Sequence, residues 1–132
     1  MNKVNNFDID LDFGQIYEKT VRDIFQGDGS IEVKTERDIW KTTGNVAFEI
    51  RYKGRPSGIS ITNAKWWCEV FTIDGDIKFI YLIETLKLRK IIKYLCLETD
   101  LTKNVMGGDN NQSELVLIPI KELINCSSGK IK

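Results

Sequence analysis

The segment Glu32-Val33-Lys34 places two residue types where they can act on the same chemical group. In a β-strand, alternate side chains point to the same face, so the Glu32 carboxylate and the Lys34 ammonium lie about 6–7 Å apart along the strand. That spacing lets both groups reach one metal-bound phosphate. An ordinary solvated strand face has the same pattern, so the interpretation depends on the residues around this segment.

The chain contains no histidine, and this limits the chemistry open to it. Ser-His-Asp and Cys-His nucleophile systems and His-ligated zinc sites are excluded within it. A general base must therefore be Lys, Asp, Glu, Tyr or a metal-bound water. The chain has 19 Asp and Glu residues, and oxygen ligands of this kind favour Mg²⁺ or Mn²⁺.

Overall composition is that of a globular protein, with 42% apolar and 29% charged residues. We predict a single domain over residues 1–132, with a core at about 10–122 and flexible termini. The formal net charge is zero, so any contact with nucleic acid must depend on a local basic patch. The chain has no long apolar run and no signal-like start, so we expect no membrane partner and a cytoplasmic location. Its three cysteines are far apart in sequence, and we expect them to be reduced.

An amphipathic pattern predicts a first helix that begins near Asp10 or Asp12. Glu18 lies at the edge of its apolar stripe. There the carboxylate can lean over the surface on which the helix packs, or it can pair with Arg22 in solvent. Both interpretations stay open.

A second alternating strand is predicted at residues 45–53, after the first one at 30–36. We expect the two strands to pair antiparallel, with Ile31 and Val33 facing the core. Glu49 then shares the face of Glu32 and Lys34. Opposed carboxylates on such a pair lie about 5 Å apart and repel unless a cation or a proton lies between them.

The remaining pattern predicts strands and helices in alternation, and the fold class α+β (α/β). The expected elements are a strand at 59–62, a helix at 62–71, a strand at 77–83, a helix at 85–95, a polar loop at 98–114, a strand at 115–120 and a frayed tail from 125. The outer side of the 85–95 helix carries Lys87, Arg89, Lys90 and Lys93. This basic patch is either a solubilising face or a phosphate contact.

The order of these elements, with Glu18 on a helix and Glu32-Val33-Lys34 on a strand, resembles the PD-(D/E)XK nuclease superfamily. Four blocks resemble small nuclease-like and Holliday junction resolvase-like proteins of bacteriophages. They are Glu32-Val33-Lys34-Thr35-Glu36-Arg37, Thr43-Gly44-Asn45-Val46-Ala47-Phe48-Glu49, Gly54-Arg55-Pro56-Ser57-Gly58-Ile59 and Thr62-Asn63-Ala64-Lys65-Trp66-Trp67. The resemblance covers about residues 12–119, and its specific part is 30–67.

The resemblance implies a restriction-endonuclease-like core, with a central mixed sheet of four to five strands flanked by helices. It implies hydrolysis of DNA phosphodiester bonds with Mg²⁺ or Mn²⁺ as cofactor. Glu32 and the carbonyl of Val33 correspond to metal ligands, and Lys34 corresponds to the water-activating lysine. Glu18 corresponds to the helix carboxylate that a subset of the superfamily carries.

The chain departs from the superfamily at the second strand carboxylate, which normally precedes the Glu-x-Lys segment. Asp28 is the upstream candidate, but in extended chain it lies roughly 13 Å from Glu32. Glu49 is the better candidate by the pairing argument, and both stay open as metal ligands. In a further alternative, Glu32 takes the aspartate role and Glu49 the glutamate role, and Lys34 is a displaced lysine.

The expected partner is DNA, and the residues expected to contact its phosphates are Lys41, Arg55, Lys65, Lys87 and Lys90. By analogy, branched DNA is the expected substrate and a homodimer the expected assembly, with two sites for paired cuts. A phage-encoded chain would act in the host cytoplasm. Two other functions stay open: a non-catalytic nucleic-acid-binding or phage assembly protein on the same fold, and a plain α+β interaction domain with a solvated strand face.

Overall fold

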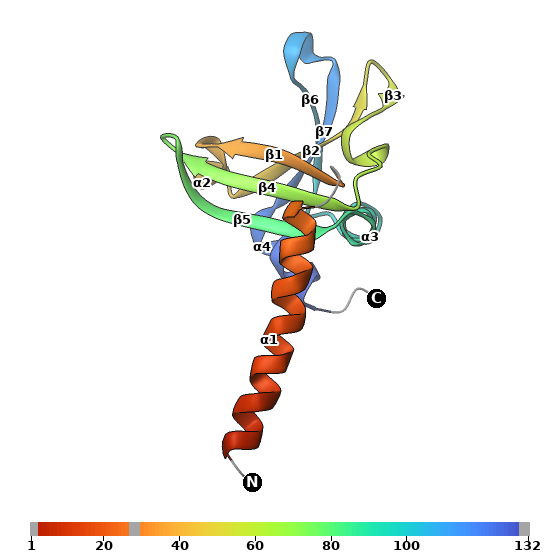
Figure 1. Cartoon of the computed structure of the whole chain (residues 1–132). Coiled ribbons are helices and arrows are strands. Elements are labelled where there is room, and N and C mark those ends of the chain that lie inside the picture. The colour runs from red at the N-terminus through yellow and green to blue at the C-terminus, as the bar shows by residue number, and fades with distance from the viewer. Residues whose placement is uncertain (1–2, 27–29, 130–132) are drawn as a thin grey trace.

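The structure is a computed structural model that describes residues 3–26 and 30–129, and it has the predicted α+β class (Figure 1). The helices are α1 Lys3–Gln26, α2 Ile39–Thr43, α3 Thr85–Glu98 and α4 Ile120–Ser128, with 3₁₀ turns η1 Gly58–Ser60 and η2 Asp109–Asn111. The strands are β1 Ile31–Arg37, β2 Asn45–Tyr52, β3 Arg55–Pro56, β4 Trp66–Ile73, β5 Asp76–Glu84, β6 Lys103–Gly107 and β7 Ser113–Pro119.

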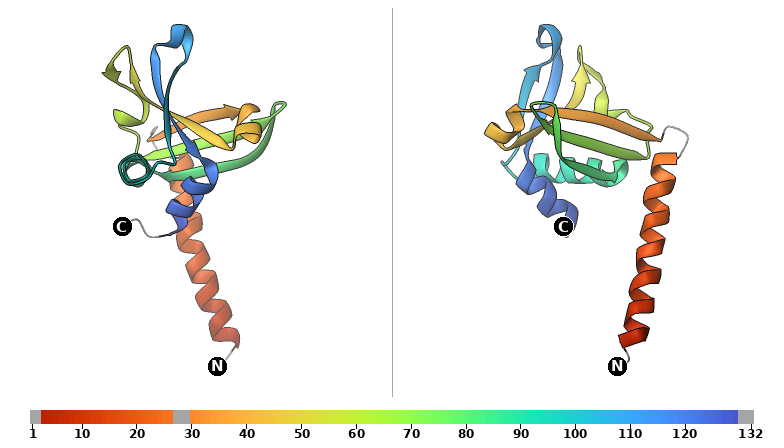
Figure 2. Two further views of the ribbon diagram at one scale, coloured as in Figure 1. Left: turned by 180° about the vertical axis from the view of Figure 1, so that it is seen from behind. Right: turned by 60° about the vertical axis from the view of Figure 1, so that its left-hand side comes forward.

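The strands form two sheets instead of one central sheet of four to five strands. In the first sheet, of order β1-β4-β5, β1 runs parallel to β4 and β4 runs antiparallel to β5. The second sheet has the order β3-β2-β7-β6 and is antiparallel throughout. The first sheet is thus mixed, and the two sheets cross in the body of the molecule (Figure 2).

The predicted antiparallel pairing of the 30–36 and 45–53 strands is wrong. The short helix α2 lies between β1 and β2 and turns the chain, with positive φ at Asp38 and at Gly44. The Asp38 side chain also accepts a hydrogen bond from the Asp74 backbone N–H, 2.7 Å away, which ties this turn to the β4–β5 connection. As a result β1 enters the first sheet and β2 enters the second.

The prediction that the Ile31 and Val33 face of β1 points to the core is also wrong. In the parallel register Glu32, Lys34 and Glu36 stand beside Trp67, Glu69 and Phe71 of β4. Trp67 and Phe71 are buried, whereas Val33 on the opposite face of β1 is 55% exposed. The inward face of β1 is therefore its charged face, because its neighbour β4 supplies the apolar side chains of the core.

Residues 62–71 do not form the predicted helix, because residues 66–73 are the central strand of the first sheet. Their run of aromatic and β-branched residues is typical of a strand covered on both sides. The predicted strand at 59–62 is replaced by the turn η1, and the short strand β3 lies just before it.

The strand at 77–83 and the helix at 85–95 are confirmed as β5 and α3. The polar stretch 98–114 contains β6, and the tail expected to fray from residue 125 is instead the last part of α4, a helix whose Leu123 is buried. The core lies between α3, α4 and the two sheets. Its fully buried large residues include Phe48, Trp67, Phe71, Leu88, Ile91, Leu95, Ile118 and Leu123.

Helix α1 begins earlier than predicted and extends away from the body of the molecule (Figures 1 and 2). Of its apolar side chains between residues 14 and 26, Ile24 is buried, while Ile16 and Phe25 are 62% and 64% exposed. None of the described helices has both the length and the apolar character needed to cross a membrane.

Candidate functional site

A pocket of about 240 Å³ opens between β1 of the first sheet and β2 of the second. It is lined by Lys34, Thr35, Glu36, Ala47, Glu49, Gly58, Trp67 and Leu115. The structure therefore brings Lys34 and Glu49 together, as the sequence predicts, although they stand on strands of different sheets. A third charged residue, Glu36, lines the same pocket.

Glu36 links the two sheets because β2 has a free edge at this point. Between Asn45 and Ile50, β2 pairs with β7 on one side, and β3 pairs with it only at Arg51 and Tyr52. The backbone N–H of Ala47 donates a hydrogen bond to the Glu36 carboxylate. A half-buried carboxylate of β1 thus satisfies a donor of β2.

Glu69 on β4 is a fully buried carboxyl that does not line the pocket, but it is the register partner of Lys34, which does. The indole N–H of Trp67 donates to its Oε1 across 2.9 Å, whereas its Oε2 has no hydrogen-bond partner. An ionised carboxylate that is buried and half-satisfied is costly. At Oε2 of Glu69, either a proton, which neutralises the carboxylate, or a bound cation can supply the missing interaction.

The pKa of Glu69 is raised to about 8, chiefly by burial and in addition by the negative charge of Glu36. The Trp67 N–H and the positive charge of Lys34 act in the opposite direction. Burial also raises the pKa of Glu36, against the hydrogen bonds from Ala47 and Glu69 that stabilise its ionised form. Burial therefore favours the protonated form of Glu69, and a cation beside it would favour the ionised form.

Lys34 stands at the rim with Glu32, whose Oε1 lies 3.1 Å from its Nζ. Both side chains are partly exposed, 48% for Lys34 and 38% for Glu32. The ion pair holds the ammonium near the carboxyl pair without burying it. Glu32 itself does not line the pocket.

Glu49 is fixed at the other wall of the pocket by two contacts. Its Oε1 accepts a hydrogen bond from the Ser113 hydroxyl, 2.6 Å away. Its backbone abuts Gly58, where an added Cβ would lie 2.3 Å from the Glu49 carbonyl oxygen and where φ is +54°. A glycine is therefore required at residue 58 for the chain to close on Glu49.

The site provides oxygen ligands for a divalent metal, but it does not form a complete protein cage. Among residues 3–26 and 30–129, no three His, Cys, Asp or Glu side chains are arranged to hold a metal ion. Glu36 and Glu69 supply two carboxylates, and Mg²⁺ is commonly held by one or two carboxylates together with waters and substrate phosphate. The unsatisfied Oε2 of Glu69 and the pocket's surplus of negative charge fit such an ion.

Several predicted site residues lie elsewhere. Glu18 is exposed on α1, and Val33, whose backbone carbonyl is the expected ligand, lies on β1 with its side chain exposed. Asp28 lies outside the described residues. Neither Glu18 nor Val33 lines the pocket.

The five cations expected to contact DNA do not line the pocket either. Lys41 is exposed on α2, Arg55 is exposed on β3, and Lys65 is exposed just before β4. Lys87 and Lys90 are exposed on α3, and the Lys87 ammonium donates to the carbonyl of Ser127 near the end of α4, 3.0 Å away.

Arg89, on the same helix, donates to the carbonyls of Ile59 and Thr62 at 2.7 and 2.6 Å, which fixes η1 against α3. Part of the basic patch on α3 therefore has a structural role.

The sequence interpretation missed the roles of Glu36 and Glu69. Glu36 continues the two-residue spacing of Glu32 and Lys34, which is a weak signal for a shared face. Glu69 is a single acid within the otherwise uncharged run 66–73, which is a stronger signal. Its importance was hidden because that run was interpreted as a helix.

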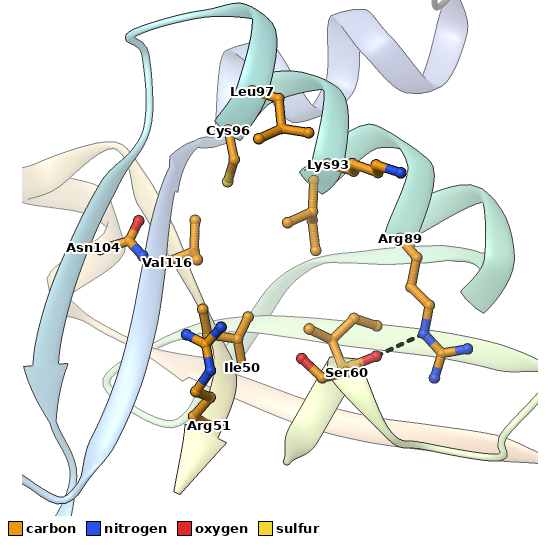
Figure 3. Close-up of a pocket in the computed structure, with 11 residues that line it drawn as sticks. Ile50, Arg51, Ser60, Arg89, Lys93, Cys96, Leu97, Asn104 and Val116 are labelled. Atoms are coloured by element: carbon orange, nitrogen blue, oxygen red, sulfur yellow. Dashed lines mark hydrogen bonds between the residues drawn. The ribbon is translucent and has the colours of Figure 1, made fainter. Parts of the chain in front are cut away.

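A second, larger pocket of about 540 Å³ lies between α3 and the second sheet (Figure 3). Its walls include Ile50, Ile59, Ile92 and Val116, and no acidic residue lines it. Figure 3 shows Arg89 at its edge, bonded to the backbone beside Ser60. This pocket therefore offers no carboxylate to a hard metal.

Comparison with protein-family models, curated proteins and solved structures gave no match for this chain.

Proposed function

We propose that this protein is a Mg²⁺- or Mn²⁺-dependent DNA endonuclease that hydrolyses phosphodiester bonds at the pocket between β1 and β2. One observation carries the proposal: the fully buried Glu69 has an oxygen without a donor, beside a second carboxyl and a lysine. The sequence also predicted acids beside a lysine for phosphodiester chemistry. Lys34 and Glu49 belong to both sets, whereas Glu36 and Glu69 take the place of Glu32 as metal ligands.

Glu36 and Glu69 are the carboxylates that hold the metal in this proposal, and Glu49 completes the acidic wall. When bound, Mg²⁺ or Mn²⁺ neutralises charge on the phosphate and acidifies a water molecule. Lys34 donates from the rim to the attacking water or to a phosphate oxygen. Glu32 positions the Lys34 ammonium through their ion pair.

The proposed substrate is DNA, with branched DNA as its preferred form, and the proposed assembly is a homodimer in the cytoplasm. Two copies of a single site can cut both strands of a junction. The chain's zero net charge requires that DNA be held by local groups of cations.

A non-catalytic nucleic-acid-binding or assembly protein is the second candidate, and one observation favours it. The Glu36 carboxylate already accepts a backbone hydrogen bond from Ala47, and it can bind the proton of Glu69. In that case Glu36 and Glu69 bind a proton instead of a metal, and their role is to join the two sheets.

Calorimetric titration with Mn²⁺ at pH 8, together with cleavage of branched and linear DNA, tests the proposal. We expect wild type to bind Mn²⁺ and cut DNA, Glu69→Gln to lose both, and Lys34→Ala to keep the metal but lose cleavage. Glu98→Gln, an exposed acid on α3, is the matched control and should behave as wild type. Absence of Mn²⁺ binding to wild type, with DNA present, would favour the structural carboxyl pair.

A further inference from the structure

The segment 50–57 connects two residues of the pocket, Glu49 and Gly58. The Ser57 N–H donates to the Ile50 carbonyl across 3.0 Å and closes the base of this hairpin. β2 and β3 form its two sides, with Tyr52 opposite Arg55. The hairpin therefore rises directly from the rim of the proposed active site.

The hairpin has a tight and defined turn. Its central residues, Lys53 and Gly54, both have positive φ, at 51° and 78°, as type I′ hairpin turns require. The Lys53 N–H donates to the Gln112 carbonyl across 2.9 Å, which ties the tip to the β6–β7 hairpin. Both hairpins project from the same side of the molecule, away from α1 (Figures 1 and 2).

The exposed surface of this hairpin is basic and aromatic. Residues 51–56 are all exposed, and they include three cations and no acid. Arg51 is paired with Glu114, so Lys53 and Arg55 are the cations left at the tip. The Lys53 ammonium lies 5.4 Å from the centre of the Tyr52 ring, and Tyr52 is 41% exposed.

We propose that the β2–β3 hairpin is the element that holds DNA against the pocket, which deepens the proposed function and rests on it. Lys53 and Arg55 contact backbone phosphates on the two sides of the turn. Tyr52 stacks on a base that is unstacked at a branch point, and it thereby selects branched over linear duplex DNA. A two-stranded ribbon of this kind also has the width that the major groove of DNA admits.

The charges of the hairpin are tested by the salt dependence of DNA binding in EDTA, where no cleavage occurs. Each lost phosphate contact lowers the slope of log K against log salt by about 1, so Lys53→Ala/Arg55→Ala should lower it by about 2. Lys78→Ala/Lys121→Ala removes two exposed charges on β5 and α4, and its slope should match wild type. An unchanged slope in the hairpin variant, or no DNA binding by wild type, would overturn the proposal.

The aromatic residue is tested by the ratio of affinities for a four-way junction and a linear duplex. Tyr52→Ala should lower this ratio by about fivefold or more, and Tyr52→Phe should keep it, because the ring provides the stacking. An unchanged ratio in Tyr52→Ala overturns the selection role. These binding measurements do not depend on cleavage, so a hairpin that binds DNA in a protein that does not cut it would count only against the nuclease proposal.

Discussion

Two pockets of this molecule differ in size and in chemistry, and the smaller one lies beside the buried carboxyl that lacks a hydrogen-bond partner. The pocket beside α3 holds about 540 Å³ and has aliphatic walls, and the Arg89 at its edge is bonded to backbone carbonyls. The pocket between β1 and β2 holds about 240 Å³ and is lined by Glu36, Glu49 and Lys34, the register partner of the buried Glu69. Volume alone would favour the first. The cost of burying a half-satisfied carboxyl is a better sign of function, because folding alone does not require it.

The strongest test of this comparison is catalytic. Glu69→Gln should lower DNA cleavage by about 10³-fold or more, since it removes a metal ligand worth several kcal/mol in the transition state. Leu97→Ala, in the wall of the larger pocket, should leave cleavage within about twofold of wild type. Initial rates on a labelled junction give both values. Equal losses in the two variants would remove the distinction between the pockets.

The second test is the pH dependence of stability without metal. The pKa of Glu69 is raised from 4.5 to about 8 in the folded state, so the unfolded chain releases this proton first as the pH rises. Stability from this group is therefore complete below pH 4.5 and is lost as the pH approaches about 8.

Glu69→Gln should lack this loss and should exceed wild type by on the order of a few kcal/mol at alkaline pH. Urea unfolding in EDTA across this pH range measures the difference, and added Mn²⁺ should restore wild type. Parallel pH profiles for the two proteins would contradict the raised pKa.

The wall formed by Glu49 gives a third test. Gly58→Ala places a Cβ against the Glu49 carbonyl and forces a left-handed φ on alanine, which should cost about 2–4 kcal/mol of stability. Gly54→Ala is the matched control, because its φ of +78° is also left-handed while nothing lies within 4 Å of its added Cβ. That variant should lose about 1 kcal/mol. Thermal unfolding of both variants separates close contact from backbone strain.

The smallest effect is expected at the rim. Glu32→Gln breaks a partly exposed ion pair, so stability should change by less than about 1 kcal/mol. Cleavage should fall by less than in Glu69→Gln, since Glu32 positions Lys34 through their ion pair and is not one of the two proposed metal ligands. A loss as large as that of Glu69→Gln would return the metal-ligand role to Glu32, as the sequence resemblance implies.

The sequence by itself determined the fold class, the elements β5 and α3, and the pairing of a lysine with acids near β1. These depend on local periodicity, which the order of residues records directly. Lys34 and Glu49 line one pocket although their strands belong to different sheets, so the strand pairing expected from the sequence is not what brings them there. The absence of histidine and the number of carboxylates also limit the chemistry, since composition alone decides which bases and metal ligands the chain can offer.

Tertiary structure alone decided which carboxyls meet. Glu36 and Glu69 belong to strands that pair in parallel, and the register aligns Lys34 with Glu69. A parallel pairing joins segments that are distant in sequence, so no local pattern specifies it. The raised pKa of Glu69 depends on burial by Trp67 and its other neighbours, and burial is a property of the assembled core.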